Sequence, residues 1–181
     1  SGAVFVNKRN AIHYENMSIA LAESVANQGQ GFINAMAFGN GGTSVDPTGI
    51  ITYLTPNSTG TNASLYNQTY SKVVDDRSVT NLDPQRNKIE TRHVNGTNYT
   101  DVLVTCLLDY GEPNGQDAVD QASQANSLYV FDELGLVSYS PSGTGKLLTH
   151  VVFHPVQKSL NRLVQIDYTV RVQSLTGFNE G

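Results

Sequence analysis

A two-residue alternation of apolar and polar side chains near the C-terminus constrains the fold of this chain most strongly. The apolar members of the alternation are Val164, Ile166, Tyr168, Val170 and Val172. The polar members between them are Gln165, Asp167, Thr169 and Arg171. Successive side chains of a strand point to opposite faces of a sheet. The pattern therefore predicts an antiparallel strand with one buried face and one solvated face.

Earlier segments extend this β pattern through most of the chain. Residues 102–110 are largely apolar on both faces, which predicts a central strand. Residues 128–139 and 146–153 lie on either side of a Pro-Ser-Gly-Thr-Gly turn and predict a hairpin. Shorter segments predict a strand at 49–54, an edge strand at 87–94 and either a strand or a short helix at 65–74. No βαβ rhythm is present, which argues against a parallel sheet.

One helix is predicted near the N-terminus. Asn10 can cap it, residues 11–28 contain neither Gly nor Pro, and Gly29 and Gly31 end it. One apolar stripe is expected to dock on the chain's own domain, and its members are Tyr14, Met17, Leu21 and Val25.

A second apolar strip lies on another side of the predicted helix and is a candidate partner interface. Its members are Ile12, Ile19 and Ala26, which repeat every seven residues. The alternative is that these are ordinary semi-exposed apolar side chains, which are common on protein surfaces.

The length of 181 residues fits one domain, or a domain with an appendage. We expect an N-terminal arm and amphipathic helix over residues 1–30, an antiparallel β domain over 31–175, and a short tail over 176–181. The predicted fold class is mainly β, an antiparallel β-sandwich-like domain with one N-terminal α-helix.

The composition excludes several classes of function. Charged residues make up only 15% of the chain and the net charge is −5, so the basic face of a nucleic-acid-binding protein is not expected. One Cys cannot form a disulfide within the chain. No apolar stretch reaches the length of a transmembrane helix. The chain instead contains 17 Asn, 16 Thr and 15 Ser, which is typical of a surface or assembly protein.

No arrangement of residues in the sequence predicts a catalytic or metal-binding site. His150 and His154 share a face of one strand but lie about 13 Å apart at the rise of a strand, too far to hold one metal ion. Cys106 lies inside an apolar strand and is expected to be a buried small hydrophobe. The carboxylates are scattered along the chain, with no pair spaced for acid–base catalysis. We therefore expect no enzyme activity, no cofactor and no catalytic or metal site.

One segment carries a recognisable motif, formed by Glu133, Leu134, Gly135 and Leu136 after Phe131-Asp132. A polar turn, a strand ending near Pro155 and the terminal alternating strand follow it. Together with the glycine-rich segment 37–42 and the Leu-Tyr sequence at 65–66, the order resembles the attachment domain of the phage tail-collar fibre protein family. The resemblance spans about residues 37–172, and Val137 and Asn40 depart from the family's usual aromatic residue and Asp.

The motif also has a physical interpretation. Gly135 inside a strand indicates a bulge or a close backbone approach. Leu134 and Leu136 are expected to share a face with Asp132, and Glu133 to share the opposite face with Phe131. A buried Glu133 needs a donor, which a backbone N–H or Arg162 could supply.

The resemblance implies a structural protein of a tailed-bacteriophage virion, docking through its β domain and helix as a tail fibre-attachment, collar or baseplate module. Its partners would be other virion proteins, as a homo-oligomer or in many copies on a symmetric particle. One alternative is a capsid decoration protein, and another is a carbohydrate-binding adhesin.

Overall fold

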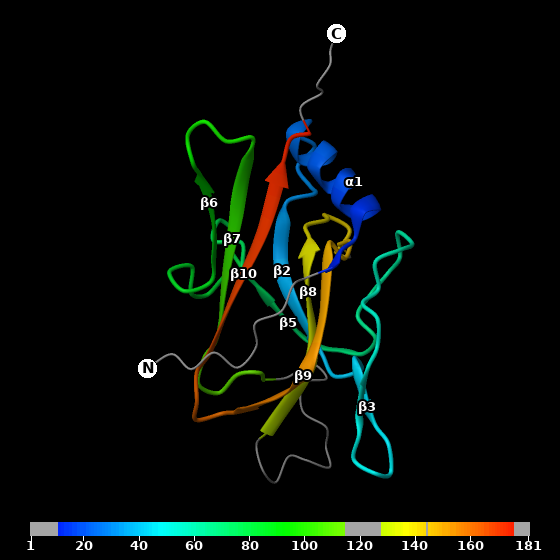
Figure 1. Ribbon diagram of the computed structural model, residues 1–181. Coiled ribbons are helices and arrows are strands. Elements are labelled where there is room, and N and C mark those ends of the chain that lie inside the picture. The colour runs from blue at the N-terminus through cyan, green and yellow to red at the C-terminus, as the bar shows by residue number, and fades with distance from the viewer. Residues whose placement is uncertain (1–10, 115–127, 144, 176–181) are drawn as a thin grey trace.

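The computed structural model of the chain describes residues 11–114, 128–143 and 145–175. The fold is mainly β, with antiparallel sheets and, within these ranges, a single short helix near the N-terminus (Figure 1). This confirms the predicted fold class. Residues 1–10 of the predicted N-terminal arm, the segment 115–127 and the predicted tail at 176–181 lie outside the described residues.

The larger of two main sheets has five strands in the order β1-β9-β8-β2-β5. Their bounds are Ala11–Ile12 for β1, Ile33–Gly39 for β2, Gln68–Val73 for β5, Leu128–Ser138 for β8 and Thr149–Ser159 for β9. All the pairs in this sheet are antiparallel. The hairpin predicted around the turn at 141–145 is therefore formed by β8 and β9, and β9 continues past Pro155.

The second main sheet has three strands in the order β10-β7-β6. Their bounds are Lys88–His93 for β6, Tyr99–Leu108 for β7 and Val164–Gln173 for β10. β7 is central and β6 is an edge strand, as the sequence predicts. β10 pairs with β7 over its full length without a register shift.

Figure 1 shows β6, β7 and β10 forming one layer beside β2, β8 and β9. The core lies between these layers and contains aromatic side chains from the larger sheet, among them Phe38, Phe131 and Phe153. Tyr168 and Val170 contribute to it from the terminal alternating strand, whose polar members Gln165, Asp167 and Thr169 are exposed. The alternation in the sequence therefore predicted the buried face correctly.

The helix α1 is shorter than predicted and spans Tyr14–Val25. His13 caps it in place of Asn10, because the His13 side chain accepts a hydrogen bond from the backbone N–H of Asn16. No helix among the described residues is long and apolar enough to cross a membrane.

The helix also docks through a different face from the one predicted. Asn16 and Ala20 are its buried residues, and Met17 packs partly against the core. Tyr14 and Val25 are 78% and 87% exposed, so the predicted docking stripe was wrong at both ends. The buried Asn16 holds this face of α1 by donating to the backbone carbonyls of Leu147, at 2.9 Å, and Thr61, at 3.5 Å.

A small third sheet lies outside the two layers. It consists of β3 (Thr43–Val45) and β4 (Ile51–Tyr53), which pair as an antiparallel hairpin. Figure 1 shows this hairpin projecting away from the main sheets beside β9. We call residues 43–53 the projecting hairpin.

Candidate functional site

The family-like motif forms the base of the projecting hairpin. Glu133 on β8 is fully buried and each of its carboxylate oxygens accepts two hydrogen bonds. One oxygen accepts from the backbone N–H groups of Gly41 and Asn67, at 3.0 and 2.8 Å. The other accepts from the Tyr66 N–H at 2.9 Å and from His150 Nε2 at 2.8 Å.

The donors to Glu133 agree in part with the sequence-based expectation. Backbone N–H groups are present, as predicted. The remaining donor is His150 rather than Arg162, which lies exposed in the turn between β9 and β10. Burial by itself raises the pKa of Glu133, but the hydrogen bonds from His150, Asn67, Tyr66 and Gly41 outweigh it and lower the pKa below its ordinary value. The site therefore holds Glu133 as a carboxylate.

His150 connects this carboxylate to the polar loop 55–67, which follows the projecting hairpin. Its side chain is fully buried, and its Nδ1 accepts a hydrogen bond of 2.7 Å from the Asn57 N–H. Because Nδ1 accepts, the hydrogen must lie on Nε2, which donates to Glu133. His150 is thus a structural histidine with a hydrogen bond at each ring nitrogen.

Asp132, the neighbouring acid, holds the first strand of the hairpin. One of its oxygens accepts from the Gly42 N–H at 2.8 Å, and the other accepts from the N–H and hydroxyl of Thr43 at 3.0 and 2.6 Å. Leu54, just after β4, donates its N–H to the Gly42 carbonyl at 2.8 Å. The root of the projecting hairpin is thus fixed at both strands.

A register shift explains why two consecutive acids can point the same way. The pairing of β8 with β9 shifts between Phe131 and Glu133. Phe131, Leu134 and Leu136 face the core, whereas Asp132 and Glu133 both bind the outer loops. The expectations that Phe131 shares a face with Glu133, and that Leu134 and Leu136 share a face with Asp132, were therefore wrong, because strict alternation stops at the shift.

Glycines allow the loops to reach the two acids. A Cβ on Gly39 would lie 2.4 Å from the Asn67 carbonyl oxygen and 2.7 Å from Glu133 Oε2. A Cβ on Gly135 would lie 2.2 Å from the Thr149 carbonyl oxygen. Both separations are far below van der Waals contact, so the close backbone approach predicted at Gly135 is confirmed.

The tip of the projecting hairpin is ordered by one aspartate and exposes apolar side chains. Asp46 Oδ1 accepts from the Thr48 N–H and hydroxyl and from the Ile50 N–H, at 2.8, 2.6 and 3.0 Å. Val45 and Ile50 flank this turn and are 62% and 63% exposed. Burying such side chains against a partner is favourable. A hairpin that is hydrogen-bonded at its root and exposes apolar side chains at its tip is suited to docking.

The predicted partner strip on the helix is not assembled by the structure. Ile12 lies in β1, pairs with Thr149 and packs against the core. Ile19 is half-buried on α1, and Ala26 is exposed at the C-cap. The three residues do not form one helical strip, because the helix begins only at Tyr14.

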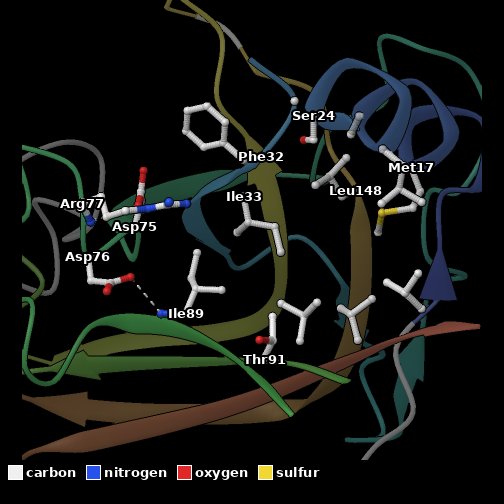
Figure 2. Close-up of a pocket in the computed structure, with 16 residues that line it drawn as sticks. Met17, Ser24, Phe32, Ile33, Asp75, Asp76, Arg77, Ile89, Thr91 and Leu148 are labelled. Carbon is white, nitrogen blue, oxygen red and sulfur yellow. Dashed lines mark hydrogen bonds between the residues drawn. The ribbon is translucent and has the colours of Figure 1, made fainter. Parts of the chain in front are cut away.

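An apolar groove of about 490 Å³ lies between α1 and the open end of the sandwich (Figure 2). Its apolar lining comes from the helix and both sheets, and includes Met17, Ile33, Ile89, Leu148 and Val170. Figure 2 shows Asp76 on the rim, where it accepts the Ile89 N–H at 3.2 Å.

The described residues contain no group of three or more His, Cys, Asp and Glu side chains that could hold a metal ion. Cys106 is fully buried, as expected, and this burial raises the pKa of its thiol to about 12. At neutral pH the thiol is therefore protonated and a poor nucleophile.

One structural contact at the edge of this site was missed from the sequence. His13 is fully buried, and its Nε2 donates to the Gly60 carbonyl at 2.8 Å. His13 and His150 thus hold the polar loop 55–67 from two sides. The local sequence around His13 carries no signal for this, because the partner is 47 residues away.

A scan of the chain against models of known protein families finds no match. A search among curated proteins also finds no match.

Proposed function

We propose that the protein is a structural component of a tailed-bacteriophage virion and docks on other virion proteins through the projecting hairpin. The observation that carries this proposal is the connection between the motif and the hairpin. Asp132 and Glu133 are buried acids that hold the hairpin root, and the hairpin tip exposes Val45 and Ile50.

The two ends of this arrangement have different roles. At the root, the buried carboxylates fix the direction of the hairpin. Each hydrogen bond from a backbone N–H to a carboxylate oxygen restricts the conformation of the loop. At the tip, two apolar side chains offer a small contact area. If many copies are present on a symmetric particle, multivalent binding through such small contacts would give a stable attachment. The resemblance favours a tail fibre-attachment, collar or baseplate position over the capsid.

A decisive test replaces both tip residues by aspartate in the phage that encodes the chain. We expect V45D/I50D protein to fold with an unchanged melting temperature and to be lost from purified particles. The matched control is T52D/T55D, which adds the same two negative charges at exposed threonines outside the tip. Wild-type particles that do not contain the chain would refute the proposal.

The position on the particle requires a second measurement. Gold labelling of the chain, viewed by electron microscopy, should place it on the tail. A regular array of label over the capsid would instead support a decoration protein. Specific binding to a glycan array by a chain that is absent from particles would support the adhesin alternative.

A further inference from the structure

The outer edge of β10 is unusually open for a strand of its length. β10 is ten residues long and ends the three-stranded sheet, and on the side away from β7 no described strand pairs with it. It contains no proline, no register shift and no charged residue on its inward face. Long regular edges of this kind are templates for pairing with another chain.

The other edge of the same sheet is protected. β6 has only six residues, and Lys88, Glu90 and Arg92 alternate along it. Charges and a short length are the usual means of blocking edge-to-edge pairing. Of the two edges of this sheet, β10 is therefore the one available for pairing with a partner.

A row of alternating charges crosses the sheet and stops at β10. Arg92 on β6 pairs with Asp101 on β7, and Asp101 pairs with Arg171 on β10. Their closest nitrogen–oxygen distances are 3.5 Å for Arg92–Asp101 and 2.8 Å for Arg171–Asp101. A carboxylate on a further strand beyond Arg171 would continue the row.

The same face of β10 carries a suitable carboxylate four residues away. Asp167 is exposed and has no cationic partner among the described residues. If two copies of β10 lie antiparallel with Thr169 opposite Thr169, Asp167 of each copy faces Arg171 of the other. Gln165 then faces Gln173. On the inward face, Ile166 faces Val172, which is 38% exposed in the single chain.

We propose that β10 pairs antiparallel with β10 of a second copy, with the two-fold axis at Thr169, to form a continuous six-stranded sheet. Every cross-strand pair in this register is apolar, amide–amide, Thr–Thr or oppositely charged, and such pairs stabilise a sheet. A two-fold interface must be complementary to itself, and the sequence of β10 satisfies this condition. The proposal does not depend on a role in a virion.

Sedimentation equilibrium of the purified chain tests the association. We expect a dimer whose Kd is weakened at least about tenfold by D167K, because both charge pairs become repulsive. The matched control is E90K, which makes the same charge change at the β6 edge and should leave the Kd unchanged. A monomeric wild-type chain, or equal effects of the two variants, would overturn the proposal.

Cysteine crosslinking tests the register. T169C should crosslink to itself with a short thiol-specific reagent, since residues directly opposite have Cβ atoms about 5 Å apart. Q165C and Q173C should crosslink to each other when mixed and far less when alone. Cys106 is fully buried and does not compete. The control is T52C on the exposed hairpin.

Three results would contradict this register. T169C could crosslink no faster than T52C, or Q165C could react equally well with itself. The outward-facing amides of β10 could also be protected from hydrogen exchange in a monomeric chain. A dimer that is absent from particles would refute the proposed function alone, and particles that carry a monomeric chain would refute this proposal alone.

Discussion

The side chain of Glu133 illustrates how one residue can organise distant parts of this chain. Its four hydrogen bonds come from the segments around Gly41 and Tyr66 and from β9. All four partners are hydrogen-bond donors, so only a side chain that acts purely as an acceptor suits the position. Neither a protonated Glu nor a Gln meets this requirement.

This requirement predicts that acid weakens the fold through Glu133. The pKa of Glu133 is lower in the folded chain than the 4.5 of a free glutamate. Its contribution to stability is therefore complete above about pH 4.5 and is lost as the pH falls through the folded-state pKa. Urea unfolding from neutral to acidic pH should show this loss, and E133Q should lower stability by about 2 kcal/mol at neutral pH.

In E133Q the dependence on acidic pH should also become shallower, because one titrating carboxylate is gone. E90Q is the control, since Glu90 is exposed on β6. An identical pH dependence in E133Q and the wild-type chain would contradict the assignment.

A second residue-scale prediction concerns Lys158. Its side chain is fully buried and its Nζ donates to the carbonyls of Asp109, Glu112 and Ser159. Burial is the main cause of the lowered pKa of Lys158. Removing the ammonium leaves three carbonyls without this donor, so K158M should cost about 3 kcal/mol in the free energy of unfolding. Chemical denaturation measures this, and an unchanged midpoint would show that water replaces the donor.

At the scale of elements, α1 shows how a helical pattern can mislead. The apolar stripe from Tyr14 to Val25 predicted the docking face, but Asn16 and Ala20 are the buried residues. Asn16 donates to the Leu147 carbonyl at 2.9 Å, so the helix is held partly by a hydrogen bond. A hydrophobic pattern cannot report this, because the acceptor is distant in the sequence.

The helix therefore yields a paired prediction. A20D should destabilise the fold by more than about 2 kcal/mol, because it buries an unpaired charge. V25D should change stability by no more than about 0.5 kcal/mol, because Val25 is 87% exposed. Thermal melts of the two variants decide between the docking faces. A larger loss in V25D would favour the stripe predicted from the sequence.

At the scale of the whole molecule, the projecting hairpin and the edge of β10 belong to different sheets. We therefore expect their effects to be independent. V45D/I50D should leave the dimer Kd unchanged, both in the wild-type chain and in the D167K background. A double-mutant cycle of dimer dissociation measures the coupling, which should be within about 0.5 kcal/mol of zero. A larger coupling would mean that the two surfaces form one interface.

The sequence by itself determined the mainly β class, the central position of β7, the edge position of β6 and the inward face of β10. These follow from alternation, which is a local property of the backbone. Only the tertiary structure decided the shift at Asp132, the docking face of α1 and the donors of Glu133. Those features depend on atoms that lie far apart along the chain and meet only when the sheets pack.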